Sequence, residues 1–153
     1  MNLRERLSAD LKDAMRARDA DRLSTLRLIN AAIKDREIAM RGEGVDGTEL
    51  AEADILAILG RMVKQRQESA RAYEEGGRLE LAEKELNEIR VIGEFLPRQM
   101  EPAEVEAAIG AAIGEVGAGS IRDMGRVMAV LKERHTGMMD FAAVGPMVKA
   151  RLG

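Results

Sequence analysis

Side chains with the potential for catalysis or metal binding are few in this chain of 153 residues. Cysteine is absent and His135 is the single histidine, so a zinc site of the His/Cys type cannot be assembled within the chain. The serines lie in helical or capping contexts, and none sits in a nucleophile-elbow motif or near a partner base. They are Ser8, Ser24, Ser69 and Ser120. No glycine pattern matches a P-loop or a dinucleotide-binding fingerprint. The residues therefore predict no catalytic group, no metal ligand and no cofactor.

The histidine and the paired carboxylates both have structural explanations. His135 lies where a helix is expected to end, and a protonated imidazole favours the negative end of a helix dipole. We interpret it as a capping or exposed residue. Glu74-Glu75 and Glu83 with Glu85 fall on a solvated helical hairpin, whereas acid–base catalysis by two carboxylates needs a buried cleft. We interpret these glutamates as surface charge.

Basic side chains concentrate near the C-terminus. Residues 1–96 and 97–121 each carry a net charge of -3, whereas residues 122–153 carry +3. The six cations of this last stretch are Arg122, Arg126, Lys132, Arg134, Lys149 and Arg151. They either form solvated helix faces or contact RNA or an acidic partner. Aromatic residues make up only 2% of the chain, too few for a platform that stacks single-stranded bases. Any RNA contact is therefore expected to use the backbone and shape of structured RNA.

A second group of cations, Lys64, Arg66 and Arg71, lies in the polar second half of a predicted long helix. Acidic residues flank the group, with Glu68 inside it. One interpretation is internal salt bridges to the helix that follows, which contribute little to stability when they are exposed. The other is a face that docks a partner or contacts phosphates.

The elements that must position these residues are helices, because apolar residues recur at intervals of three and four. Asn2 is expected to cap a first helix in a capping box with Glu5, and either Asp19 or Asp21 is expected to cap a second. The first helix has one apolar face, formed by Leu3, Leu7, Leu11 and Met15. The second has a broader stripe, which predicts contact with two neighbouring helices. Its apolar residues are Leu23, Leu26, Ile29 and Ile33, widened by Leu28, Ala32 and Ile38.

A long antiparallel hairpin is expected next. Residues 41–47 read as a loop, and a third helix starts within residues 48–51 with an apolar first half and a polar second half. Gly76-Gly77 provides the left-handed cap that reverses the chain. The fourth helix presents Leu79, Ala82, Leu86, Ile89 and Phe95 or Leu96. Pro97 ends it at Leu96, since the residue before a proline disfavours the α conformation.

The remaining residues predict three smaller helices. Pro102 suits a first helical position, Ser120 to Asp123 form a capping box, and Asp140 caps the last helix, which Pro146 must either kink or begin. Gly110 and Gly114 indicate either a closely approaching helix or a ligand groove. No strand pattern is present. The sequence thus predicts an all-α protein with an N-terminal four-helix portion containing a long hairpin, residues 1–96, and a three-helix C-terminal tail domain, residues 97–153.

The N-terminal residues, Met1 to Arg6, lack the apolar run of a signal peptide. No apolar run approaches the roughly 20 residues that span a bilayer. We therefore expect a cytoplasmic protein without a membrane partner.

Several motifs resemble those of the YqeY family. They are KQR-x-ES-x(3)-Y at residues 64–73, GGR-x-E-LA-x(2)-E at residues 76–85 and E-FLP-x-QM at residues 94–100. The tail motifs are similar to the C-terminal tail of the B subunit of the tRNA-dependent amidotransferase. They are D-MG-x-VM at residues 123–128, D-F at residues 140–141 and VKA-x-L at residues 148–152. The resemblance spans essentially the whole chain.

The resemblance implies an all-helical protein in two parts. In the amidotransferase the similar tail docks on the outer corner of tRNA, while a kinase-like cradle and an amidase, which have no counterpart here, perform the chemistry. The family label of carbon–nitrogen ligase with glutamine as amido donor belongs to that larger enzyme. Release of ammonia from glutamine needs an activated nucleophile, and this chain offers none.

Three hypotheses follow from the residues and the resemblance. The first is a non-catalytic helical module of tRNA metabolism that contacts structured tRNA through its basic C-terminal helices. The second is an accessory component of a glutamine-dependent tRNA amidotransferase. The third is a protein–protein adaptor whose polar hairpin docks a partner helix.

Overall fold

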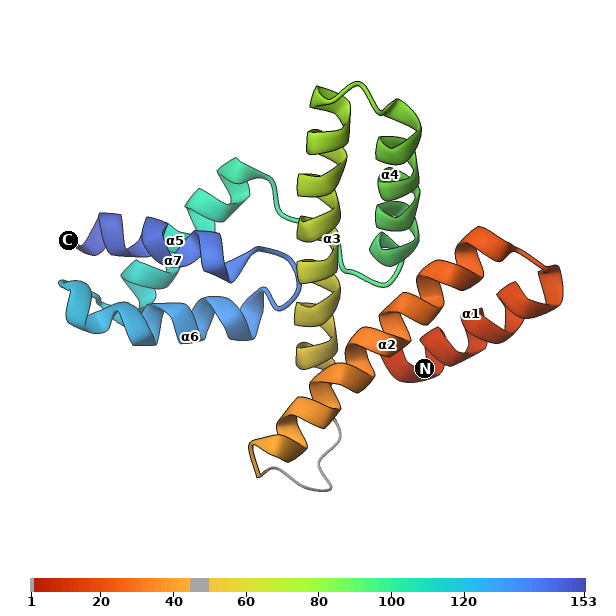
Figure 1. The fold of residues 1–153 in the computed structure, drawn as a ribbon. Helices are drawn as coiled ribbons and strands as arrows, with labels where there is room; N and C mark the ends of the chain where they lie inside the picture. Colours follow the sequence, from red (N-terminus) through yellow and green to blue (C-terminus); the bar gives the residue numbers. More distant parts are fainter. Residues whose placement is uncertain (1, 45–49) are drawn as a thin grey trace. The chain divides into compact units, whose positions relative to one another are not determined.

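A computed structural model describes residues 2–44 and 50–153, in which all regular structure is helical (Figure 1). The prediction of an all-α fold is confirmed. The elements are α1 (Leu3–Ala17), α2 (Ala20–Gly42), α3 (Glu52–Glu75), α4 (Leu79–Gly93), α5 (Pro102–Val116), the short 3-10 helix η1 (Ile121–Asp123), α6 (Met124–Arg134) and α7 (Phe141–Leu152). The chain divides into two compact units, an N-terminal unit that ends at Leu96 and a C-terminal unit, Pro97–Gly153.

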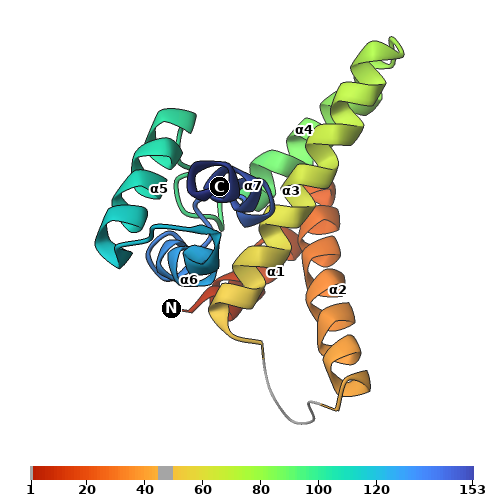
Figure 2. The ribbon, with the colours of Figure 1, turned by 90° about the vertical axis from the view of Figure 1, so that its left-hand side faces the viewer.

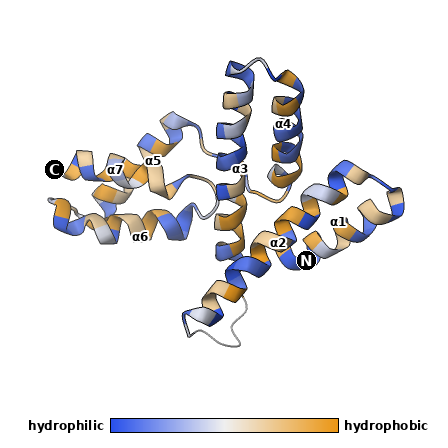
Figure 3. Ribbon diagram, viewed as in Figure 1, coloured by the Kyte–Doolittle hydropathy of each residue, from blue (hydrophilic) through white to orange (hydrophobic). Residues whose placement is uncertain are grey.

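The N-terminal unit packs α1 to α4 around one apolar core. Ile29 of α2, Leu59 of α3 and Ile92 of α4 have no exposed surface. Only the first half of α3 contributes to this core, and Figure 3 shows the change from an apolar to a hydrophilic second half along this helix. The second half is instead covered by α4, which lies beside it in an antiparallel hairpin (Figures 1 and 2). Buried Ala70 and Ala82 supply the small side chains that a close helix pair requires.

The predicted caps of the N-terminal helices are confirmed. The Asn2 side chain accepts a hydrogen bond from the Glu5 backbone N–H at 2.8 Å, and the Glu5 carboxylate accepts one from the Asn2 N–H. Asp19, rather than Asp21, caps α2 by accepting from the Arg22 N–H at 3.2 Å. Each cap satisfies backbone donors that would otherwise face solvent at the start of the helix.

Three predicted apolar faces, on α1, α2 and α4, include residues that are exposed in the structure. Met15, Leu28, Ile38, Leu79 and Leu86 all belong to the predicted stripes but are between 41% and 67% exposed. On α2 the buried set narrows to one stripe, formed by Thr25, Leu26, Ile29 and Ile33. On α4 the buried residues are Ala82 and Ile92. The apolar stripe of a helix, as seen in the sequence, shows which side of the helix faces the core. It does not show how much of that side the neighbouring helices cover.

Several predicted boundaries also shift. Arg41 and Gly42 continue α2 instead of starting a loop, and α3 begins at Glu52; residues 45–49 of the predicted loop and helix start lie outside the described residues. The helix α4 ends at Gly93 rather than Leu96. Its chain continues in a turn of i to i+3 hydrogen bonds, which is a common way for a helix end to tighten.

The hairpin turn between α3 and α4 is a Schellman motif, as the glycine pair predicted. The Arg78 N–H bonds the Tyr73 carbonyl at 2.8 Å and the Gly77 N–H bonds the Glu74 carbonyl at 3.1 Å. Gly77 has a φ of 73°, in the left-handed region.

Replacing Gly77 with alanine is expected to lower the free energy of unfolding of the N-terminal unit by about 1 kcal/mol, because a Cβ disfavours the left-handed conformation. Chemical denaturation followed by circular dichroism measures this change. The control is Gly60→Ala, in the middle of α3, where an added Cβ meets nothing within 4 Å. That variant is expected to gain about 0.5–1 kcal/mol, since alanine is the better helix former. Equal changes in the free energy of unfolding for the two substitutions would contradict the left-handed conformation of Gly77.

The C-terminal unit has a core of its own. Ile109 of α5, Val127 of α6 and Val148 of α7 have no exposed surface, and Leu131 is 1% exposed. The predicted caps are again confirmed: Pro102 opens α5, Ser120 and Asp123 form a capping box, and Asp140 accepts from the Ala142 N–H. The capping box opens η1, which leads directly into α6. Pro146 lies inside α7 and does not begin it.

The two glycines of α5 differ in their surroundings. A Cβ at Gly110 would lie 3.4 Å from the guanidinium of Arg151, a side chain, while a Cβ at Gly114 would meet nothing within 4 Å. The predicted approach of a neighbouring helix is therefore found at Gly110, where α7 supplies Arg151, and is wrong at Gly114.

An ion pair between Arg98 and Glu104 links the segment before α5 to the first turn of this helix. Arg98 donates to both carboxylate oxygens of Glu104, at 2.9 and 2.8 Å, and the Glu101 N–H donates to the same carboxylate. The Arg98 hydrogen bonds and then the Glu101 N–H lower the pKa of Glu104 from 4.5 to about 2. Because the folded value is below the unfolded one, the stabilisation is present above pH 4.5 and is lost as the pH falls towards about 2.

The carboxyl carbon of Glu104 is therefore expected to titrate in NMR with a midpoint near 2. In an Arg98→Gln variant the midpoint should rise towards the ordinary glutamate range, although not fully, because the Glu101 N–H remains. An unchanged midpoint in the variant would show that Arg98 does not hold this carboxylate.

Candidate functional site

Three of the six predicted RNA-binding cations are held in ion pairs within the C-terminal unit. Both terminal nitrogens of Arg134 donate to the carboxylate of Glu115, which joins α6 to α5. Arg126 donates to Asp123 at 2.6 Å. Arg151 donates from α7 to the Glu106 carbonyl at 3.0 Å, and lies 3.9 Å from the Glu106 carboxylate. These arginines connect the helices of the unit.

The carboxylates of two of these pairs are stabilised in the charged form. The Arg134 guanidinium lowers the pKa of Glu115, and Glu115 in turn raises the pKa of Arg134. Arg126, followed by the Gly119 N–H, lowers the pKa of Asp123. Each ionised carboxylate compensates the charge of its arginine, so these arginines offer less uncompensated charge to an incoming phosphate.

The other three cations, Arg122, Lys132 and Lys149, are exposed. Their side chains take part in no ion pair or side-chain hydrogen bond among residues 2–44 and 50–153. Arg122 lies on η1, Lys132 near the end of α6 and Lys149 near the end of α7, and α6 contacts both η1 and α7. We refer to these three residues as the free cations of the C-terminal unit.

The cations of the hairpin differ in how far they are exposed. Arg66 donates to Glu88 of α4 at 2.9 Å and to the Met62 carbonyl at 3.1 Å, and the Arg66 and Glu88 side chains are only 15% and 14% exposed. The predicted internal salt bridge to the fourth helix is thus confirmed for Arg66. This leaves Arg66 poorly placed to dock a partner. Lys64 and Arg71 lie exposed on α3.

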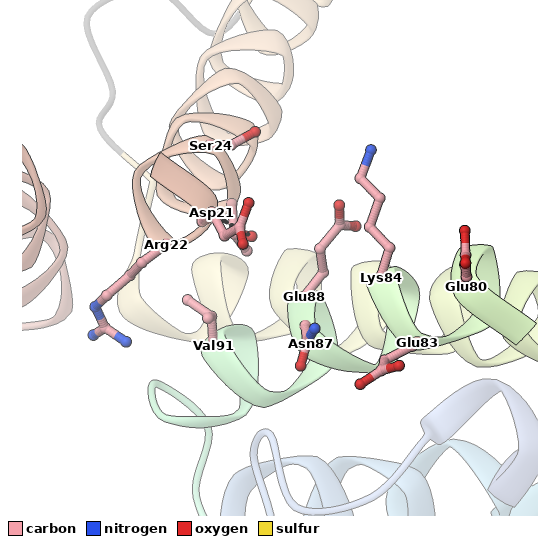
Figure 4. Close-up of a pocket in the computed structure, with 10 residues that line it drawn as sticks. Asp21, Arg22, Ser24, Glu80, Glu83, Lys84, Asn87, Glu88 and Val91 are labelled. Carbon is pink, nitrogen blue, oxygen red and sulfur yellow. Dashed lines mark hydrogen bonds between the residues drawn. The ribbon is translucent and has the colours of Figure 1, made fainter. Parts of the chain in front are cut away.

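A groove between α2 and α4 was not predicted. It has a volume of about 300 Å³ and both of its walls are helical (Figure 4). From α2 it is lined by Asp21, Arg22, Ser24 and Thr25, and from α4 by Glu80, Glu83, Lys84, Asn87, Glu88 and Val91. The spacing of the α4 residues in the sequence indicates that they share one helix face. The sequence has no local pattern that would predict α2 opposite this face.

Neither a metal cluster nor a membrane span is found in the described chain. No group of three or more histidine, aspartate or glutamate side chains in residues 2–44 and 50–153 is arranged to hold a metal ion. Among the helices of the same residues, none combines the length and apolar character that crossing a membrane requires.

Comparison with known families gives one match over nearly the whole chain. Residues 4–152 match the family described as Yqey-like protein. The chain belongs to the YqeY family. The resemblance read from its motifs is thereby confirmed, and the match covers both units of this YqeY chain.

Several curated relatives of the YqeY chain are fungal proteins. It is 38% identical over 90 residues to "Altered inheritance of mitochondria protein 41, mitochondrial" of Clavispora lusitaniae, covering 59% of this chain and 49% of the relative. The protein of the same name from Lachancea thermotolerans is 33% identical over 110 residues, covering 72% and 55%. An uncharacterized protein of Schizosaccharomyces pombe is 32% identical over 96 residues, covering 63% and 73%. The YqeY chain thus spans about half the length of the first two relatives.

Proposed function

We propose that this protein is a non-catalytic helical module that binds structured tRNA through the free cations of its C-terminal unit. The observation that carries the proposal is the uncompensated positive charge of Arg122, Lys132 and Lys149, in a unit whose other predicted cations are used internally. The resemblance of residues 123–152 to the amidotransferase tail that docks on tRNA supports the same partner.

The chemistry of the free cations suits phosphate rather than base recognition. Lysine and arginine side chains neutralise phosphates and release condensed counterions, which supplies affinity that is independent of base sequence. Phe141 is the single aromatic residue of the C-terminal unit and is partly buried, so a stacking platform for single-stranded bases is not available there. The proposal therefore favours a folded RNA whose backbone shape is fixed.

Binding of a fluorescent tRNA transcript, measured by anisotropy at increasing salt, tests this function. The expected log–log slope is about -2.7, since each of three phosphate contacts contributes about -0.9. An unstructured RNA of equal length and charge is the control and should bind more weakly. Equal affinity for the two RNAs, or a slope near zero, would contradict the proposal.

An assay for ammonia release from glutamine addresses the second hypothesis, an accessory role in an amidotransferase. We expect no release by the purified chain, and glutamine hydrolysis would overturn the non-catalytic assignment. The names of the yeast relatives place those proteins in mitochondria, whereas the sequence predicts a cytoplasmic location here. We propose that the protein is located in a compartment that contains tRNA. The cytoplasm and the mitochondrial matrix both contain tRNA.

A further inference from the structure

The groove between α2 and α4 carries negative charge that the protein does not compensate. The carboxylates of Asp21, Glu80 and Glu83 are exposed and take part in no ion pair or hydrogen bond in the described part of the chain. Two of the other charged groups that line the groove are already paired. Arg22 bonds Asp10 and Glu94, at 3.3 and 2.6 Å, and Glu88 bonds Arg66. Lys84 is the one remaining cation among the lining residues.

The groove also has apolar surface. Val91 lines the groove from α4 (Figure 4), and the buried Thr25 lines it from α2. Leu28 follows Ser24 by one helical turn, so it extends the α2 wall, and it is 41% exposed. An exposed leucine close to unpaired carboxylates suits a protein ligand, because protein interfaces combine apolar and charged contacts. A metal ion would instead require clustered oxygen ligands, and leucine provides none.

The length of the groove fits a helix. From Glu80 to Val91 the α4 wall extends about 16 Å, the length of three helical turns. Figure 4 shows Glu80, Lys84 and Glu88 in one row along α4, on the side that faces α2. A helix laid beside this row would place cationic side chains near Asp21, Glu80 and Glu83 while its apolar face meets Leu28 and Val91.

We propose that this groove docks an amphipathic helix of another protein whose flanks are rich in lysine and arginine. This is the helix-in-groove mode of recognition, in which apolar anchors give affinity and complementary charge gives orientation. The site lies in the N-terminal unit and uses none of the free cations, so it is independent of the proposed tRNA site. It gives the adaptor hypothesis a specific surface, in place of the predicted docking cations Lys64, Arg66 and Arg71.

The test uses the full chain and a designed, fluorescently labelled peptide of about 18 residues, long enough for several helical turns. The peptide carries leucines at i, i+3, i+4 and i+7 with lysines on both flanks. A scrambled peptide of the same composition, without the amphipathic pattern, is the peptide control. Neutralisation of the groove by Asp21→Asn, Glu80→Gln and Glu83→Gln is compared with Glu68→Gln, Glu74→Gln and Glu75→Gln, which removes three exposed carboxylates outside the groove.

The groove variant is expected to weaken binding of the amphipathic peptide at least about tenfold, and the control variant less than about twofold. A Ser24→Trp variant, which fills the groove without changing charge, should weaken binding to a similar degree. Circular dichroism verifies that each variant is folded. A variant with Arg122→Gln, Lys132→Gln and Lys149→Gln should bind the peptide as the unchanged protein does, and this separates the groove from the tRNA site.

Equal binding of the scrambled peptide, or equal losses in the groove and control variants, would overturn the proposal. Sedimentation velocity of the protein alone provides a further outcome. If the chain self-associates and neutralising the groove abolishes that association, the occupant is a second copy of this chain and the proposed partner is wrong.

Discussion

Replacing Leu59 with alanine is expected to lower the free energy of unfolding of the N-terminal unit by about 3–5 kcal/mol. Leu59 has no exposed surface and lies in the core that α2, α3 and α4 share. The substitution removes the transfer free energy of the buried side chain and leaves a cavity that the surrounding helices fill only in part. This loss is a large fraction of the stability of an ordinary domain. Denaturant unfolding followed by circular dichroism and by NMR resonances from each unit measures it.

Leu131→Ala is the matched substitution in the C-terminal unit, where Leu131 is 1% exposed in a separate apolar core. Because the two cores share no residue, each substitution is expected to move the unfolding transition of its own unit alone. This also tests the predicted division into residues 1–96 and 97–153. A single transition that both substitutions shift equally would show that the chain unfolds as one cooperative body.

The sequence predicted helix caps better than helix bounds, because caps depend on local chemistry. Asn2 with Glu5, the Gly76-Gly77 pair and Pro102 each act within one turn of their own position, and all three have the predicted role. Such residues satisfy or terminate backbone hydrogen bonds regardless of what the rest of the chain does.

The extent of burial was predicted less well. Leu28 and Leu86 fit their helical stripes, yet each is more than 40% exposed, because the described helices of the N-terminal unit leave these side chains partly uncovered. Periodicity gives the direction of an apolar face, whereas coverage depends on the lengths and crossing points of helices far away in the sequence. The same limit explains the groove, whose walls come from residues 21–25 and 80–91.

Neutralising the free cations with Arg122→Gln, Lys132→Gln and Lys149→Gln is expected to weaken tRNA binding by about 100- to 1,000-fold near 0.1 M salt. At that salt concentration each phosphate contact contributes roughly one power of ten through counterion release. The three residues are exposed and lie outside both apolar cores, so the fold should be preserved. Anisotropy of the labelled tRNA measures the affinity, with circular dichroism to verify folding.

The division of the C-terminal cations into free and paired residues was not predictable from the sequence. Arg134 and Glu115 are 19 residues apart, and Arg151 and the Glu106 carbonyl are 45 residues apart, so each contact depends on how the helices pack. Only Arg126 with Asp123, at i, i+3 spacing, has a local pattern. Composition identified the basic segment, and the fold decides which of its charges remain available.

The salt dependence of tRNA binding by two matched triple variants tests the central claim most directly. One variant lacks the free cations, and the other replaces Arg27, Arg61 and Arg78 of the N-terminal unit with glutamine, removing the same charge from exposed positions. For the variant without the free cations, we predict that the slope of log affinity against log salt concentration decreases in magnitude by about 2.7. For the N-terminal variant, we predict almost no change in this slope. Equal losses in the two variants would show that tRNA responds only to net charge, and an unchanged slope in the first would place the binding site elsewhere.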